Sequence, residues 1–236
     1  MDIQLSESLI SMVIGIRFRA NFSIEDQLGQ IVDQILYSKD SYFNPKKFPL
    51  VQSGVGRKIL TNQSTGDQLT IDNSNIILEI IFGDSFAITD LNRILECYES
   101  EIIKGIMKKF AIKEIVRIGY IKRYIFKIEK LAKKFVDKTI GSTLEGINDI
   151  HLSFSKKLPV EEALVKDAVN DYDNAIFTVI KKADLDEIFM SVDYQRYYDP
   201  FLPLSTEVKF IPFIDRAEKF NVNRYLPWLK SNYLED

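Results

Sequence analysis

Basic side chains are the residues whose number and spacing are best suited to chemistry in this chain. Residues 104–138 carry twelve lysines and arginines against three acidic residues, although the formal net charge of the whole chain is −3. A local positive field on an acidic protein attracts phosphate-rich or acidic partners. The sequence therefore predicts a binding surface for an anionic partner, and it predicts no reaction.

Alternation along two predicted strands, 10–19 and 115–126, indicates where some of these side chains point. In both strands apolar residues alternate with other residue types, so the arginines of these strands are expected to face away from the core. In a ferredoxin-like sheet the first and last strands are neighbours, which would bring these arginines onto one sheet face. Lysines of a helix predicted over 128–140 lie nearby. The candidate phosphate-binding residues are Arg17, Arg19, Arg117, Arg123, Lys130, Lys133 and Lys134.

The same arginines have a second interpretation. Arg17 and Arg117 could instead form ion pairs with acids such as Glu79 or with acidic residues of the second half of the chain. Aromatic side chains that could stack on bases are not apparent on the predicted face, which weakens an RNA-binding interpretation.

A polar and aromatic cluster over 193–199 precedes Pro200. Tyrosine and arginine are favoured in protein interfaces, so Tyr194, Arg196 and Tyr197 are candidate contact residues for a partner. Packing of the same rings against the following loop is an equal alternative.

Residue types that usually carry catalysis are scarce. His151 is the only histidine and Cys97 the only cysteine, so the sequence predicts no catalytic residue, no metal site and no cofactor. Carboxylates such as Asp184, Asp186 and Asp193 support only a less favoured hypothesis of an enzyme. The absence of a second cysteine also excludes an internal disulfide and favours a reducing cytoplasm.

The elements that must position these residues predict an α+β fold. Residues 1–140 are expected to form a ferredoxin-like half with the order β-α-β-β(β)-α-β. Residues 141–236 are expected to add a helix, a four-stranded antiparallel meander and a C-terminal helix that starts near Leu226, packed with the first half as one compact unit. The predicted elements of the first half are strand 10–18, helix 24–37, strand 51–60, a hairpin 69–82 around Asn73-Ser74, helix 85–110, strand 115–126 and helix 128–140. The predicted meander strands are 150–154, 164–169, 176–180 and 188–194.

Composition agrees with a globular protein, at 46% hydrophobic and 28% charged residues. No stretch approaches the length of a membrane span, and no signal peptide is evident, so a cytoplasmic location without membrane contact is expected.

Four short motifs resemble those of a large, sporadically distributed family of uncharacterised bacterial proteins. The motifs are Arg117-Ile118-Gly119-Tyr120-Ile121-Lys122-Arg123-Tyr124, Ile14-Gly15-Ile16-Arg17-Phe18, the hairpin 69–78 and Met190-Ser191-Val192-Asp193-Tyr194. The resemblance implies an arrangement of elements. It implies no activity, because the family has none established.

Two main hypotheses about function follow. The leading one is a non-enzymatic binding or regulatory protein that acts through a macromolecular partner, either another protein or a second copy of itself. The alternative is a nucleic-acid-binding or RNA-processing protein that uses the basic stretch 104–138. Two ferredoxin-like halves are similar to the CRISPR RNA-processing endonucleases, but their glycine-rich loop is absent here and the isoelectric point of 5.4 is low for that class.

Overall fold

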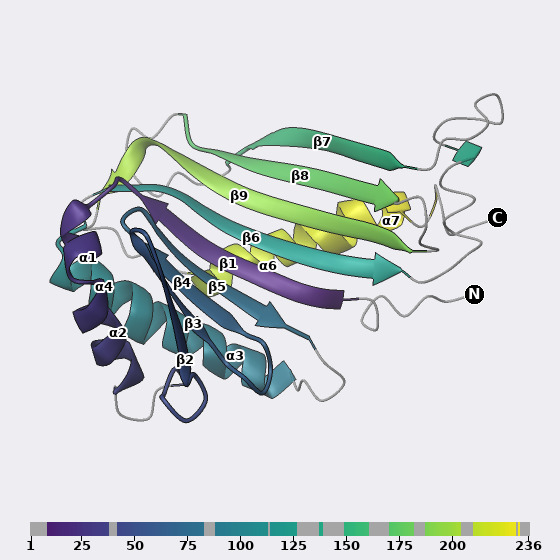
Figure 1. The fold of residues 1–236 in the computed structure, drawn as a ribbon. Coiled ribbons are helices and arrows are strands. Elements are labelled where there is room, and N and C mark those ends of the chain that lie inside the picture. The colour runs from purple at the N-terminus through teal and green to yellow at the C-terminus, as the bar shows by residue number, and fades with distance from the viewer. Residues whose placement is uncertain are drawn as a thin grey trace.

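A computed structural model describes most of the chain (Figure 1). The described residues are 9–37, 42–82, 88–112, 114–126, 137–138, 149–160, 170–181, 187–203, 210–229 and 231. The predicted helix over 128–140 lies outside them except for 137–138, which are helical, and so does the predicted strand 164–169.

The described strands form one nine-stranded sheet with the order β2-β3-β4-β5-β1-β6-β9-β8-β7, and every neighbouring pair is antiparallel. The strands are β1 (Leu9–Phe18), β2 (Leu50–Gly54), β3 (Arg57–Thr61), β4 (Gln68–Asp72), β5 (Asn75–Ile81), β6 (Glu114–Phe126), β7 (Ile150–Pro159), β8 (Tyr172–Lys181) and β9 (Ile188–Pro203). Because β6 pairs with β9, both halves of the chain contribute to the same sheet.

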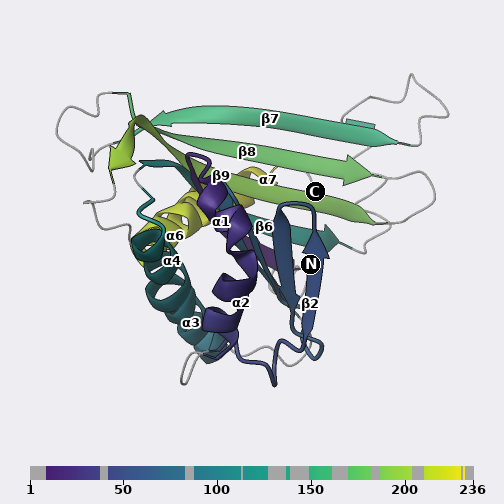
Figure 2. The same ribbon diagram turned by 60° about the vertical axis from the view of Figure 1, so that its left-hand side comes forward.

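The described helices lie against one face of this sheet (Figures 1 and 2). They are α1 (Phe22–Asp26), α2 (Leu28–Leu36), α3 (Ile88–Cys97), α4 (Lys104–Lys109), α6 (Phe210–Phe220) and α7 (Leu226–Leu229). Two π-helical segments, η1 (Tyr98–Ile103) and η2 (Asn221–Tyr225), join α3 to α4 and α6 to α7. None of the helices in the described ranges is both long and apolar enough to cross a membrane.

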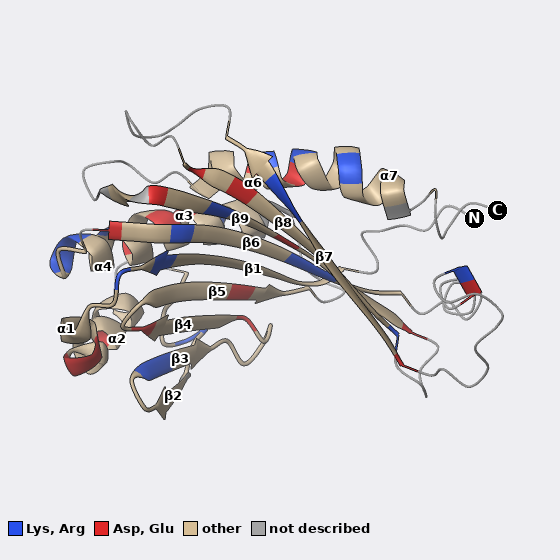
Figure 3. Cartoon of the chain, turned by 90° about the horizontal axis from the view of Figure 1, so that it is seen from above, with Lys and Arg blue, Asp and Glu red and all other residues tan. Residues whose placement is uncertain are grey.

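Side-chain alternation explains why the sheet has one covered and one open face. In β1 the even positions from Met12 to Phe18 are buried, and they pack with Tyr98 and Ile102 of η1 in one hydrophobic core. The odd positions, which include Gly15 and Arg17, point to the opposite side. No described helix lies on that opposite side, which we call the open face (Figure 3).

The predicted ferredoxin-like arrangement is wrong. Residues 51–60 were expected to form one strand, but they form the hairpin of β2 and β3, in which Gly56 takes a positive φ of 66° that favours glycine. This hairpin extends into β4 and β5 as a meander of four consecutive strands, and its last strand pairs antiparallel with β1. In the second half β7, β8 and β9 are described; they form an antiparallel meander, and β9 joins it to β6 in the same sheet.

Two helical segments also begin earlier than predicted. The first helix begins after Asn21, whose side chain accepts a hydrogen bond from the Ser23 backbone N–H at 3.1 Å. The predicted start near Leu226 matches α7, but the helical segment that ends in α7 begins earlier, at Phe210. Pro212 stands in the first turn of this segment, where a missing N–H costs nothing, so the proline is compatible with the helix.

Candidate functional site

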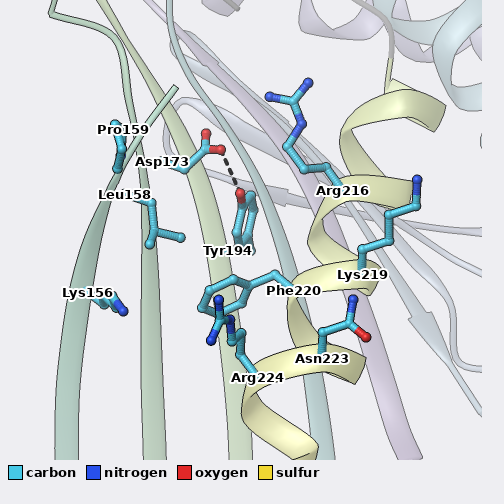
Figure 4. A pocket seen from close by; sticks show the side chains of 10 residues that line it. All are labelled: Lys156, Leu158, Pro159, Asp173, Tyr194, Arg216, Lys219, Phe220, Asn223 and Arg224. Atoms are coloured by element: carbon cyan, nitrogen blue, oxygen red, sulfur yellow. Dashed lines mark hydrogen bonds between the residues drawn. The ribbon is translucent and has the colours of Figure 1, made fainter. Parts of the chain in front are cut away.

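A cleft lies between β7, β8 and β9 on one side and α6 and η2 on the other (Figure 4). Its volume is about 620 Å³. We call it the basic cleft. Its lining residues are Lys156, Leu158, Pro159, Asp173, Tyr194, Arg216, Lys219, Phe220, Asn223 and Arg224.

The floor of the basic cleft includes Asp173 and Tyr194, and Asp173 forms a buried ion pair with the neighbouring Arg196. Asp173 of β8 and Arg196 of β9 face each other across neighbouring strands, and each is only 3% exposed. Arg196 donates through Nε and Nη2 to the two carboxylate oxygens, the second at 2.8 Å, and the Tyr194 hydroxyl donates to Asp173 Oδ2 at 2.6 Å. The negative charge of Asp173 is therefore compensated within the floor.

Burial and these bonds also fix the ionisation of the floor. Burial raises the pKa of Tyr194, and the hydrogen bond to Asp173 raises it further. Burial alone lowers the pKa of Arg196, but the hydrogen bond and the charge of Asp173 outweigh it and raise the pKa overall. The floor therefore holds a neutral phenol and a charged guanidinium.

The rim of the basic cleft carries four cations. Arg216, Lys219 and Arg224 come from α6 and η2, and Lys156 comes from β7 on the other side. All four side chains are exposed, and none forms an ion pair with a described residue. The helix presents this stripe because the intervening Phe213, Ile214 and Ala217 are buried. The cleft thus has an uncompensated positive charge.

An aromatic ring flanks the basic cleft. Phe154 lies two residues before Lys156 in β7, so both point to the same side of the strand. One side of its ring stacks on Phe177 with the centroids 5.2 Å apart, and Trp228 approaches it edge-on at 5.3 Å. The Phe154 residue is still 42% exposed. A planar ligand group could therefore contact the exposed part of this ring.

The open face carries a second cluster. Arg17 of β1 stands opposite Arg117 of β6, and Arg117 stands opposite Tyr197 of β9, which stands opposite Tyr172 of β8. The two tyrosine rings stack with their centroids 4.9 Å apart. The Arg117 guanidinium lies 5.5 Å from the Tyr197 ring and Lys157 Nζ lies 3.9 Å from the Tyr172 ring, so each end of the stack is capped by a cation. Figure 3 shows the basic segments of β1 and β6 side by side.

The structure brings together only some of the residues chosen from sequence. Arg17, Arg117 and Tyr197 lie together on the open face. Arg123 shares this face but pairs with Glu79, and Arg19 lies beyond β1 and pairs with Glu114 at 2.9 Å. Tyr194 and Arg196 point to the helix-covered side, into the floor of the basic cleft. Lys130, Lys133 and Lys134 lie outside the described residues.

Sequence reasoning missed two features of these sites. The open face does carry aromatic rings, because β8 and β9 extend further than predicted and include Tyr172 and Tyr197. The basic stripe of the cleft was also missed, although the three-residue spacing of Arg216 and Lys219 places both on one side of a helix and could have revealed it.

Comparison with known proteins adds no family to this picture. No protein-family model matches the chain, and no curated protein matches its sequence. The resemblance to a family of uncharacterised bacterial proteins therefore stays a prediction. Within the described ranges, no group of three or more His, Cys, Asp or Glu residues is placed to hold a metal ion.

Proposed function

We propose that the protein is a binding protein whose basic cleft holds a single-stranded nucleic acid. The observation that carries the proposal is the combination of four cations, none of which pairs with a described residue, with the partly exposed ring of Phe154 beside them. Grooves that bind single strands combine the same two parts: cations that follow the phosphates and aromatic rings on which bases stack.

The spacing of the cations supports a linear ligand. Arg216 and Arg224 are eight residues apart, which corresponds to about 12 Å along a helix. Lys156 lies across the cleft from them, so a strand between β7 and the helix would meet cations on both sides (Figure 4). A base of this strand would lie next to Phe154, beside Lys156.

An acidic protein segment is the competing ligand. Its carboxylates could use the four cations equally well, but they would gain no stacking energy from the exposed part of the Phe154 ring. Base stacking on an aromatic side chain contributes about 1–3 kcal/mol per base. The exposed ring therefore favours the nucleic acid.

The test is fluorescence anisotropy with a labelled oligothymidylate and, separately, a labelled polyglutamate peptide. The variant Arg216→Glu/Lys219→Glu/Arg224→Glu should abolish oligonucleotide binding. The matched control Lys46→Glu/Arg93→Glu/Lys108→Glu changes the net charge equally at exposed positions outside the cleft, and it should bind like the wild type. Phe154→Ala should weaken binding by about 5-fold or more.

Two results would contradict the proposal. One is equal loss in the cleft variant and the control, because the binding would then follow net charge alone. The other is binding of polyglutamate in preference to the oligonucleotide, which would identify an acidic protein as the partner.

A further inference from the structure

The open face contains a hollow that is independent of the basic cleft. Gly15 of β1 lies directly opposite Gly119 of β6. Because neither residue has a side chain, the sheet surface is open above them, and a hollow of about 120 Å³ forms there. Its polar walls come from Arg17, Arg117, Asn75, Gln195 and Asp193.

One end of the hollow is cationic. Arg17 and Arg117 are direct cross-strand partners on the same face, an arrangement that is destabilising for like charges unless an anion lies between them. Arg117 Nη1 donates to Gln195 Oε1 and to the Tyr197 hydroxyl, each at 3.1 Å. These two hydrogen bonds fix the position of the Arg117 guanidinium. Arg17 is exposed and makes no hydrogen bond or ion pair with a described residue. The two guanidinium groups can therefore share one carboxylate of a ligand.

The other end of the hollow offers an acceptor. The Gln195 side-chain amide donates to Asp193 Oδ2, while the buried Asp193 Oδ1 receives no hydrogen bond from a described residue. Burial raises the pKa of Asp193, although its bond to Gln195 and the charges of Arg117 and Arg123 oppose the shift. A buried acceptor without a donor is destabilising, and a ligand ammonium group would remove this cost.

Gln195 sets the distance between the two ends. Its amide oxygen accepts from Arg117 and its amide nitrogen donates to Asp193, so one amide group spans the gap between cation and carboxylate. The residue is only 6% exposed although no described helix covers it. An α-amino acid also carries an acceptor, its carboxylate, next to a donor, its ammonium group, and the two are separated by a similar distance to the oxygen and nitrogen of this amide. It could therefore accept from Arg117 and donate to Asp193 in the same order.

We propose that the hollow binds a small free α-amino acid, with its carboxylate between Arg17 and Arg117 and its ammonium group on Asp193 Oδ1. The small volume of the hollow, about 120 Å³, supports a small ligand such as glycine, alanine or serine. The inference does not depend on the proposed function of the basic cleft.

The test is isothermal titration calorimetry with glycine, L-alanine and L-serine, and with acetate and methylamine as the two halves of the ligand. Gly119→Ala is the sharpest variant, because its added Cβ would lie 3.9 Å from the nearest atom, Gln195 Cγ. This is an ordinary contact, so the variant should fold while its methyl group fills the hollow. Gly105→Ala is the control, since its Cβ meets nothing within 4 Å and it lies on α4.

We expect at least one amino acid to bind the wild type and the control alike. Its affinity should fall by about tenfold or more in Gly119→Ala, Arg17→Gln and Asp193→Asn, with oligonucleotide binding unchanged in all three. The inference is overturned if no amino acid binds, if Gly119→Ala binds like the wild type, or if acetate binds as tightly as the amino acids. In none of these cases would the outcome bear on the basic cleft, which is measured separately.

Discussion

The buried pair of Arg196 and Asp173 gives the clearest prediction about stability. Both residues are 3% exposed, and Asp173 forms part of the floor of the basic cleft. The variant Arg196→Met keeps most of the side-chain volume but leaves the Asp173 carboxylate buried without its partner. Removal of one member of a buried pair costs about 3–5 kcal/mol, so we expect a loss of that size in the free energy of unfolding.

A second variant separates the charge from the packing. In Asp173→Asn/Arg196→Met the stranded charge is removed, and the asparagine still provides an acceptor for the Tyr194 hydroxyl. Only hydrogen bonds are then lost, so the stability should return to within about 1.5 kcal/mol of the wild type. The assay is urea unfolding followed by circular dichroism, with comparison of the slopes. A loss under about 1 kcal/mol in Arg196→Met, or a double variant less stable than the single one, would refute the reasoning.

Three further predictions concern the core, the open face and the sheet. Ile102→Ala should lower the free energy of unfolding by about 2–5 kcal/mol, because Ile102 is 1% exposed in η1. Lys104 is exposed, so Lys104→Ala should change the free energy of unfolding by less than about 0.5 kcal/mol. Equal losses for the two variants in urea unfolding would contradict the observed packing. Because the pKa of Asp193 is raised from 3.8, the folded state holds its proton to higher pH than the unfolded state, so the contribution of Asp193 lowers stability as the pH rises. The urea midpoint of Asp193→Asn should therefore fall less than that of the wild type between pH 4 and neutrality. Parallel curves of urea midpoint against pH for the two proteins would exclude the raised pKa. Residues 1–140 and 141–236, expressed separately, should not fold, because β6 and β9 are neighbours in one sheet, and a cooperative melt of either fragment alone would contradict this.

Local pattern was sufficient for most individual elements. Alternation identified β1 and β6, and the Asn73-Ser74 turn was correctly placed between β4 and β5. These features depend on neighbouring residues alone, whose periodicity the sequence displays directly.

Strand partners could not be predicted in the same way. Alternation assigns a residue to a face, but it does not tell which strand lies beside it. The turn at Gly56 divides one predicted strand into β2 and β3. Four strands instead of three therefore lie between α2 and α3, and the last of them, β5, pairs antiparallel with β1. Arg17 and Arg117 were nevertheless correctly expected on one face, since β1 and β6 are neighbours in both arrangements.

The basic cleft was beyond sequence reasoning for a related reason. Its cations come from β7 and from α6 with η2, which are more than 50 residues apart in the chain. Pro212 also disguised the start of α6. In the basic segment 104–138, in contrast, the neighbouring Lys122 and Arg123 of β6 point to opposite sides of the sheet, where Lys122 pairs with Glu218 and Arg123 with Glu79.

The salt dependence of oligonucleotide binding tests the central claim most directly. Each phosphate contact in a single strand contributes about −0.7 to the slope of log Kobs against log salt concentration. Four contacts in the basic cleft predict a slope of about −2.8 for the wild type, reduced by about 0.7 in Lys219→Ala. A slope that is the same in Lys219→Ala as in the wild type would show that the phosphates lie elsewhere, and a slope near zero would show that the cleft does not bind a nucleic acid backbone.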